Sequence, residues 1–330
     1  MEAGRFEDWG FGLVNLISDK GVVGAMTIIM RILDIIRIRI MDREIVLFSF
    51  IQGIKKINAS IPVLLNVRES YDSRVKEGHI IVSEKVWVLV LVVLLNVVKV
   101  IAVAGEGFLA RDMAFENTAG PEKHQAVALR INADLAAVYR CTISGYQDTL
   151  YIHSYRQFYR ECNISGTIDY IFGNAAVVFQ GCNIISRMPL PGQGTVITAQ
   201  SRDSPDEPTG ISIQNCSILA TDELYSNLDT VNSYLGRPWR NYSTTVIMES
   251  FIDDFIDPEG WSEWSGDDGL DTLYYGEYEN SGRGADTANR VTWAGYHVMD
   301  YDEASEFTVS EFITGEEWLD STSFPYDDAV

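Results

Sequence analysis

A short pattern of apolar and polar positions repeats in the middle third of this 330-residue chain. Cys141–Gly145 (CTISG) aligns with Cys162–Gly166 (CNISG), which gives the repeat a period of 21 residues. Two partial copies follow at Cys182–Ser186 and Cys216–Leu219. Self-similarity at this period is typical of a solenoid, in which each repeat supplies one unit of a stack.

The first three copies each follow a short segment with high β propensity. These segments are Ala136–Arg140, Arg156–Arg160 and Ala175–Phe179, and Gly or Asn turn signals come after them. Residues 105–250 contain no helical pattern long enough to alternate with such strands. The pattern therefore predicts an all-β fold, a parallel β-helix in which one repeat forms one coil.

Residues 1–100 show a different pattern, with two long apolar runs and little glycine punctuation. The runs are Ile28–Ile40 and Val86–Val98, and the second is interrupted only by Asn96. The second run is short for a membrane span, and its valine and leucine content favours a buried strand. The acidic first residues lack the basic-then-apolar order of a signal peptide, so no export signal is visible.

The formal net charge of −22 is concentrated at one end of the chain. Residues 251–330 contain 21 Asp and Glu residues but only two cations, Arg283 and Arg290. Such a surface disfavours binding to nucleic acid, to anionic membranes and to a fully de-esterified polysaccharide, whereas a neutral substrate region suits it better. A solvated acidic face that keeps the protein soluble is the simpler interpretation.

The four cysteines all lie in the repeat region. None forms a CxxC pair or has a histidine at metal-ligand spacing, so we expect no metal site. Strands of neighbouring coils lie about 4.8 Å apart, which falls inside the Cα separation of about 4.4–6.8 Å that a disulfide requires. We therefore predict a Cys141–Cys162 disulfide, with Cys182 and Cys216 as a second possible pair. Two disulfides fit a secreted protein, and four buried thiols are the alternative.

Asp148 and Asp169 occupy the same position in consecutive repeats. The coil geometry places them side by side, facing one direction, about 5 Å apart. Two carboxylates at that separation repel by roughly 3 kcal/mol at an effective dielectric constant of 20, so one should stay protonated near neutrality. Such a pair can supply one acid and one base or nucleophile. Aspartates that only cap backbone amides in the turns are the structural alternative.

Four sequence blocks resemble plant pectin methylesterases, in the order and spacing of that family. The blocks are Gly120–Ala128 (GPEKHQAVA), Gly145–Tyr151 (GYQDTLY), Gly166–Ala175 (GTIDYIFGNA) and Leu235–Trp239 (LGRPW). The resemblance covers about residues 101–320. It implies a right-handed, single-stranded parallel β-helix of the pectin-lyase-like type. It also implies hydrolysis of galacturonate methyl esters to pectate and methanol, without a cofactor.

The resemblance assigns a role to each residue of an aspartyl esterase site. Asp169 would be the nucleophile that forms an acyl-enzyme, and Asp148 would protonate the departing methanol and later activate water. Arg237 would hold Asp169 ionised, because an opposite charge lowers the pKa of a carboxyl group. Gln125 and Gln147 would donate hydrogen bonds to the oxyanion of the tetrahedral intermediate.

Four aromatic residues are the candidates for contact with the sugar rings. Trp239 would stack on one ring, with Tyr151, Tyr170 and Phe172 along the same groove. By resemblance, the substrate is pectin (methylated homogalacturonan), the protein is a monomer, and a proteinaceous pectinesterase inhibitor is a possible partner. The same resemblance implies secretion to the cell wall and a role in cell wall modification and pectin catabolism.

The resemblance does not extend into residues 1–100, so we divide the chain into 1–100 and a catalytic β-helix domain, 101–330, with an acidic C-terminal segment. A divergent cap, a lineage-specific replacement, and a wrong reading frame or retained intron all fit residues 1–100. The abrupt join at Ile101 favours the third explanation.

Two other functions compete with the esterase. An inactive pectin-binding relative is the first, because the altered region would adjoin the substrate groove and leave substrate unpositioned. A retaining glycoside hydrolase is the second, since it also uses two carboxylates about 5 Å apart. The paired glutamines argue against the hydrolase, because acyl transfer needs oxyanion donors and an oxocarbenium-like transition state does not.

Overall fold

The computed structural model describes residues 61–66, 79–82, 87–93 and 98–330. All of these lie in the larger of two compact units, residues 60–330. The side chains are described from Ile101 onward. The boundary expected between residues 100 and 101 stays a prediction, and the run Ile28–Ile40 lies outside the described residues.

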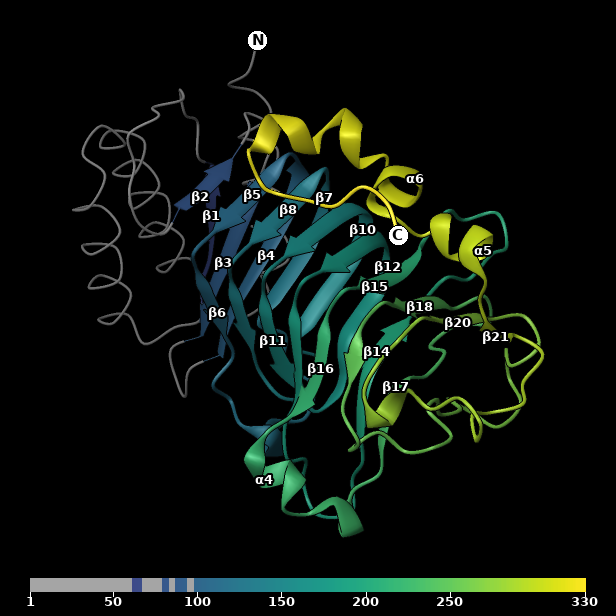
Figure 1. Cartoon of the computed structure of the whole chain (residues 1–330). Helices are drawn as coiled ribbons and strands as arrows, with labels where there is room; N and C mark the ends of the chain where they lie inside the picture. The colour runs from purple at the N-terminus through teal and green to yellow at the C-terminus, as the bar shows by residue number, and fades with distance from the viewer. Residues whose placement is uncertain (1–60, 67–78, 83–86, 94–97) are drawn as a thin grey trace. The chain divides into compact units, whose positions relative to one another are not determined.

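A sheet of 15 strands forms most of the described unit (Figure 1). Its strands are β1 (Ile61–Asn66), β2 (His79–Val82), β3 (Trp87–Val93), β4 (Val98–Glu106), β5 (Phe108–Arg111), β7 (Leu129–Asp134), β8 (Ala136–Tyr139), β10 (Leu150–Arg160), β12 (Ile168–Gln180), β14 (Thr195–Gln200), β15 (Gly210–Gln214), β17 (Ser233–Gly236), β18 (Thr244–Met248), β20 (Tyr274–Tyr278) and β21 (Tyr296–Val298). β4 and the later strands of this sheet pair parallel with one another, whereas β4 pairs antiparallel with β3 and β5 pairs antiparallel with β2. The parallel β-helix expected from the repeat is confirmed.

A second sheet of six strands closes the other side of the coils. Its strands are β6 (Ala114–Glu116), β9 (Thr142–Ser144), β11 (Asn163–Gly166), β13 (Asn183–Ser186), β16 (Ser217–Ala220) and β19 (Phe251–Ile252). Each of the sequence repeats supplies one of these strands, and the repeats pair in register. Their isoleucines therefore stack inside the solenoid, and four of them, Ile143, Ile164, Ile184 and Ile218, are fully buried.

Helices are few and short in the described part of the chain. They are α4 (Asp222–Tyr225), α5 (Tyr301–Ser305) and α6 (Val309–Ile313), with 3-10 turns η1 (Pro121–Lys123), η2 (Leu228–Thr230), η3 (Arg283–Ala285), η4 (Gly315–Glu317) and η5 (Leu319–Thr322). No helix among these residues is both long and apolar enough to cross a bilayer. The expected lack of long helices between residues 105 and 250 is confirmed.

The apolar run Val86–Val98 contributes strands, as its composition predicts. β3 covers Trp87–Val93, and β4 begins at Val98. β3 pairs antiparallel with both β1 and β4, whereas β4 pairs parallel with β7. The described strands before residue 98 therefore join the sheet by antiparallel pairing. The coils after residue 98 pair with one another in parallel.

The predicted disulfide between Cys141 and Cys162 is not formed, and Cys141, Cys162, Cys182 and Cys216 are all buried free thiols. In-register residues of parallel strands point the same way about 4.8 Å apart, whereas a disulfide needs Cβ atoms about 3.8 Å apart. The thiols are hydrogen-bonded instead: Cys182 Sγ accepts from the amide of Cys162 at 3.4 Å. Cys216 Sγ accepts from the amide of Cys182 at 3.3 Å. Ser250 continues this ladder, because its Oγ accepts from the amide of Cys216 at 3.0 Å.

The C-terminal segment covers the outer face of the long sheet. Apolar side chains of α6 and of the residues after it, including Val309, Ile313 and Trp318, pack on Phe158 and Val178. This second apolar cluster lies outside the coils, so the sheet is buried on both faces there. Parallel strands buried on both faces read as nearly continuous apolar runs, which explains the composition of β12.

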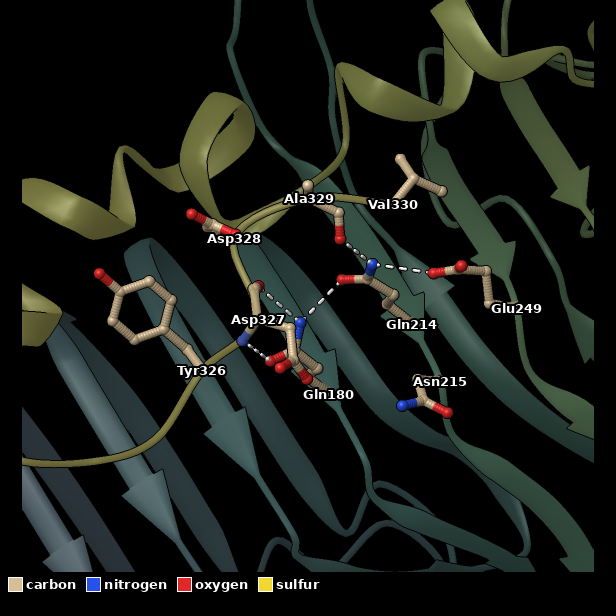
Figure 2. Close-up of a pocket in the computed structure, with 9 residues that line it drawn as sticks. All are labelled: Gln180, Gln214, Asn215, Glu249, Tyr326, Asp327, Asp328, Ala329 and Val330. Carbon is tan, nitrogen blue, oxygen red and sulfur yellow. Dashed lines mark hydrogen bonds between the residues drawn. The ribbon is translucent and has the colours of Figure 1, made fainter.

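The last residues of the chain run across a pair of stacked glutamine side chains (Figure 2). Gln180 Nε2 donates to Gln214 Oε1 at 2.9 Å, and both amides also bond to the tail. Gln180 exchanges two 2.9 Å bonds with the backbone of Asp327, and Gln214 donates to the carbonyl of Ala329 at 2.8 Å. The side-chain amides therefore hold the tail as backbone amides of a neighbouring strand would.

The thiol ladder predicts that all four cysteines are reduced and protected in the folded protein. Burial raises the pKa of the Cys141 thiol to about 11, which lowers its reactivity further. Titration with a thiol reagent should find no fast-reacting group in the native protein and four groups after denaturation. Two groups or none after denaturation would restore the disulfide hypothesis.

Substitution at the middle of the ladder should separate hydrogen bonding from packing. Cys182→Ala removes the acceptor for the buried amide of Cys162 and should lower the free energy of unfolding by about 1–3 kcal/mol. Cys182→Ser should cost less, because Ser250 already fills the equivalent place with an oxygen acceptor. Denaturant unfolding measures both, and equal losses would contradict the role of the hydrogen bond.

Candidate active site

The two predicted aspartates lie on neighbouring coils of the long sheet. Asp148 precedes β10 and Asp169 lies near the start of β12, and these strands pair in register from Leu150 with Ile171. The amide of Asp148 donates to the carbonyl of Ile168 at 3.0 Å, so one backbone bond joins the two turns. The structure thus brings both carboxyl groups to the same place on adjacent coils.

Both aspartates adopt the left-handed backbone conformation, with φ of 62° at Asp148 and 50° at Asp169. Asp and Asn tolerate this region better than other non-glycine residues, but it still costs energy. The same unusual conformation on two successive coils turns both side chains away from the regular inward and outward alternation of the strands. Their shared orientation is therefore set by the backbone.

Arg237 forms a two-pronged ion pair with Asp169. Its Nε donates to Oδ1 at 2.8 Å and its Nη2 donates to Oδ2 at 2.6 Å, while Asp169 is only 5% exposed. A pair of hydrogen bonds of this kind fixes the orientation of the Asp169 carboxylate and also stabilises its negative charge. The backbone amide of Arg237 is held in turn by the carbonyl of Thr198 at 3.0 Å, just after β17.

The surroundings separate the two carboxyl groups electrostatically. The pKa of Asp148 is raised to about 7, mainly by burial and also by the nearby charge of Asp169, while Arg237 acts in the opposite direction. Burial also raises the pKa of Asp169, but there Arg237 opposes it with direct hydrogen bonds as well as charge. Asp148 is therefore suited to carry a proton near neutral pH, and Asp169 is the member of the pair whose ionised form has a partner.

Gln125 and Gln147 come from loops on adjacent coils. Gln147 directly precedes Asp148, and the amide of Ala126 donates to the carbonyl of Gln147 at 3.1 Å. Gln125 is exposed and Gln147 is half-buried. Neither side-chain amide is hydrogen-bonded to another described residue, so both can donate to a ligand beside the aspartates.

Three of the four predicted aromatic residues form a connected row. The rings of Tyr151 and Phe172 stack with centroids 4.4 Å apart, and Phe172 lies 6.0 Å from Trp239. Tyr151 and Phe172 are register partners on β10 and β12, so the row follows from the stacking of coils. Ring separations of this size are favourable for aromatic pairs.

The assignment of Tyr170 to the groove is wrong. Its side chain is fully buried in the core of the solenoid, and its hydroxyl group lies 3.2 Å from Ser186 Oγ. The reason is the left-handed turn at Asp169, after which Tyr170 points inward. A ring without exposed surface cannot stack on a sugar.

Two residues that sequence reasoning missed extend the aromatic row. Trp264 is 40% exposed, lies 6.4 Å from Trp239 and covers the guanidinium of Arg237 at 4.4 Å. Arg130 lies over the ring of Tyr151 at 5.4 Å and is its register partner on β7. Trp264 sits in the acidic C-terminal segment, outside the repeats, so no periodic signal marked it.

Two hollows in the described part lie away from these residues. One, of about 400 Å³, lies beside the C-terminal tail and the glutamine pair (Figure 2). The other, of about 440 Å³, is lined by Arg202, Glu207 and Tyr274 among others. No group of three or more His, Cys, Asp or Glu side chains among the described residues is arranged to hold a metal ion.

Comparison with known sequences gives strong matches over the catalytic part. A sequence profile described as Pectinesterase matches residues 95–316. The protein named probable pectinesterase/pectinesterase inhibitor 12 of Arabidopsis thaliana is 69% identical over 230 residues, which is 70% of this chain and 42% of that protein. A pectinesterase/pectinesterase inhibitor of Ficus pumila var. awkeotsang is 59% identical over 68% of this chain and 42% of its own length. The chain thus spans less than half the length of these curated relatives.

Solved structures agree with the sequence matches. Pectin methylesterase from carrot is 53% identical, with a TM-score of 0.68 over 69% of this chain and 72% of the carrot protein. A pectin methylesterase from Aspergillus niger is 36% identical, with a TM-score of 0.56 over 65% of each chain. The profile match covers more than half of the chain and includes every predicted site residue. The chain therefore belongs to the pectinesterase family.

Proposed function

We propose that this protein hydrolyses the methyl esters of galacturonate in pectin, giving pectate and methanol through an acyl-enzyme on Asp169. The observation that carries the proposal is the ion pair of Arg237 with one aspartate of a pair whose other member has a pKa raised to about 7. One carboxylate is thereby suited to attack and the other to donate a proton. Membership of the pectinesterase family supports this assignment.

In the first step, an oxygen of Asp169 attacks the ester carbonyl carbon and the carbonyl π electrons move to oxygen. Gln125 and Gln147 donate hydrogen bonds to this oxyanion, which is the charge that develops in the transition state. When the tetrahedral intermediate collapses, the bond to the methoxy group breaks and Asp148 gives that oxygen its proton. Methanol leaves, and an anhydride joins Asp169 to the galacturonate carboxyl group.

In the second step, Asp148 is ionised and acts as a base. It removes a proton from a water molecule, whose oxygen attacks the galacturonate carbonyl carbon of the anhydride. Collapse of the second intermediate releases Asp169 as a carboxylate and the sugar as a carboxylic acid, and Asp148 holds a proton again. Each group returns to its starting state, so no cofactor is consumed.

The aromatic row supplies a surface for the polysaccharide. Tyr151, Trp239 and Trp264 are partly exposed, and apolar ring surface of this kind suits the apolar faces of pyranose rings. Phe172 is only 7% exposed, so it supports Tyr151 and Trp239 from within the row. A methylated segment carries no charge, which suits a protein with a formal net charge of −22. The complete set of acid, nucleophile and oxyanion donors favours an active enzyme over an inactive pectin-binding protein.

The biological setting is part of the same proposal. Because pectin is the proposed substrate, we propose that the protein is secreted to the cell wall and acts in cell wall modification and pectin catabolism. The compound names of its relatives, pectinesterase/pectinesterase inhibitor, support a proteinaceous inhibitor as a partner. We propose that it acts as a monomer.

Replacement of the nucleophile should abolish methanol release. Asp169→Ala should lower the rate on highly methylated pectin by at least about 1,000-fold, because no other group near Arg237 can form the acyl-enzyme. Methanol is measured directly, and circular dichroism checks folding. Asp203→Ala, at an exposed aspartate outside the site, is the matched control and should keep full activity.

The products distinguish an esterase from a glycoside hydrolase. An esterase releases methanol without creating reducing ends, whereas cleavage of the backbone creates reducing ends. Reducing ends released by the parent and lost in Asp169→Ala would overturn the assignment in favour of the hydrolase. If the folded parent releases neither methanol nor reducing ends, the inactive pectin-binding protein becomes the better interpretation.

The raised pKa of Asp148 makes stability depend on pH. The pKa is about 7 in the folded protein against an ordinary value of 3.8, so the contribution of Asp148 to stability is most favourable below pH 3.8 and is lost as the pH rises through about 7. Asp148→Asn removes this dependence and should raise the melting temperature at pH 8 more than at pH 5. Thermal unfolding of both proteins across this range tests the sign, and a larger gain at pH 5 would contradict it.

A further inference from the structure

A short segment from Gly260 to Trp264 lies along the end of β17, where Arg237 begins. The amide of Leu235 donates to the carbonyl of Gly260 at 2.7 Å, and the amide of Ser262 donates to the carbonyl of Gly236 at 2.9 Å. Gly236 and Trp261 form an isolated parallel bridge between these two bonds. The backbone just before Arg237 is therefore attached to this segment.

Trp261 is the inward-facing residue of the segment, and it is held on two sides. Its fully buried indole stacks on Tyr275 with centroids 4.2 Å apart. Its Nε1 donates to Glu277 Oε1 at 3.1 Å. One contact fixes the plane of the ring and the other fixes its direction within that plane.

Glu277 belongs to a buried ion pair with Arg290, and each side chain is only 2% exposed. Arg290 donates from Nε to Oε1 at 2.8 Å and from Nη2 to Oε2 at 3.0 Å. Arg290 also donates to the carbonyls of Pro258 and Gly284, at 3.1 and 2.6 Å. The Glu277 carboxylate that accepts from the Trp261 indole is therefore held by an arginine that is itself fixed by four hydrogen bonds.

Gly236 has no free space on its side-chain face. A methyl group there would lie 2.1 Å from Thr198 Oγ1 and 3.0 Å from Cζ3 of Trp261. Thr198 also accepts the Arg237 amide at 3.0 Å through its carbonyl. The backbone that carries Arg237 is thus clamped between a strand of the solenoid and the indole of Trp261.

The same segment also contacts the other end of the Arg237 side chain. Trp264, three residues after Trp261, covers the guanidinium at 4.4 Å. Arg237 is consequently bounded at its backbone by Trp261 and at its charged group by Trp264. Displacement of the segment would release both ends together.

We propose that Trp261 is a positioning residue for the esterase reaction: anchored by the buried Glu277–Arg290 pair, its indole fixes Gly236 and thereby aims Arg237 at Asp169. The proposal rests on the function proposed above. A buried ion pair contributes little net stability compared with apolar residues of the same volume. We therefore explain the ion pair next to Trp261 by its effect on the orientation of the indole. Apolar neighbours would pack against the ring but would not accept its N–H, so they would not fix its direction.

The test compares two buried tryptophans with different partners for the indole N–H. Trp261 donates to a carboxylate of the buried ion pair, and Trp318 donates to a backbone carbonyl. Trp261→Leu removes the clamp on Gly236. Trp318→Leu is the matched control, because Trp318 is also buried and donates its indole N–H to the carbonyl of Ile313 at 3.1 Å, in the apolar cluster outside the coils. Both variants should lose stability in denaturant unfolding. Trp261→Phe keeps an aromatic ring but removes the N–H donor. This variant replaces Trp261→Leu in the test if Trp261→Leu does not fold.

The first readout is the pKa of Asp169. If Trp261 only stabilised the fold, its replacement would not change this pKa. The charged or titratable groups that face this carboxyl group are Asp148, Arg237 and Tyr275. If Arg237 moves away, Asp169 loses the partner of its charged form and should titrate at higher pH. Nuclear magnetic resonance of protein labelled with carbon-13 at the aspartate carboxyl groups follows this titration. Asp148→Asn and Asp169→Asn assign the signals.

Kinetics of methanol release give the second readout. In Trp261→Leu, kcat should fall on the order of 10- to 100-fold while KM changes little, because the substitution removes the indole behind Gly236 but keeps the backbone bonds that hold the segment and its Trp264 in place. The acid limb of kcat/KM should move to higher pH in parallel with the titration of Asp169. Trp261→Phe should show a smaller change in the same direction, and Trp318→Leu should show none.

The outcomes separate this proposal from the proposed function. A folded Trp261→Leu or Trp261→Phe protein in which Asp169 titrates as in the parent would overturn the positioning role. A shifted titration together with a parent that releases no methanol would support the positioning of Arg237 and refute the esterase. A shift of equal size in Trp318→Leu would show a general effect of destabilisation and would also overturn the proposal.

Discussion

The in-register hydrogen bonding of one coil to the next is the constraint on which the rest of this structure depends. Because parallel strands repeat about every 4.8 Å, any residue placed at the same point of two repeats is placed beside its copy. This one rule stacks the thiols, the isoleucines and the aromatic pair Tyr151 and Phe172. It also brings together two acidic groups that would otherwise repel one another, and the Arg237 guanidinium offsets that repulsion at Asp169.

The parts of the fold and site that obey this rule could be predicted from the sequence. The period of 21 residues was visible in the cysteine and glycine positions, and it fixed the register of β9 with β11. The same period aligns Asp148 with Asp169 in the sequence. The rule does not predict a disulfide between Cys141 and Cys162, because side chains that point the same way from adjacent strands are too far apart at Cβ.

The parts that depend on side-chain direction or on distant segments could not be predicted. Tyr170 follows an aspartate in the left-handed conformation, and this local rotation, which no periodicity reveals, sends its ring into the core. Trp261 and Trp264 lie in an irregular segment after the repeats, and their contacts with Arg237 join residues far apart in the chain. The pattern of apolar positions carries no signal for such contacts. It also gives no sign that the Glu277 carboxylate is buried.

The left-handed backbone at both aspartates has a consequence for how such proteins diverge after gene duplication. Asparagine adopts this conformation as readily as aspartate, and the codons for the two residues differ by one base. At Asp148, a single nucleotide change to asparagine would therefore remove the proposed proton donor and keep the backbone conformation of the turn, whereas at Asp169 the same change would also leave Arg237 without its ionised partner. The two carboxyl positions are therefore unequal: one mutational step at Asp148 would remove the proposed proton donor without breaking an ion pair, and the same step at Asp169 would break one.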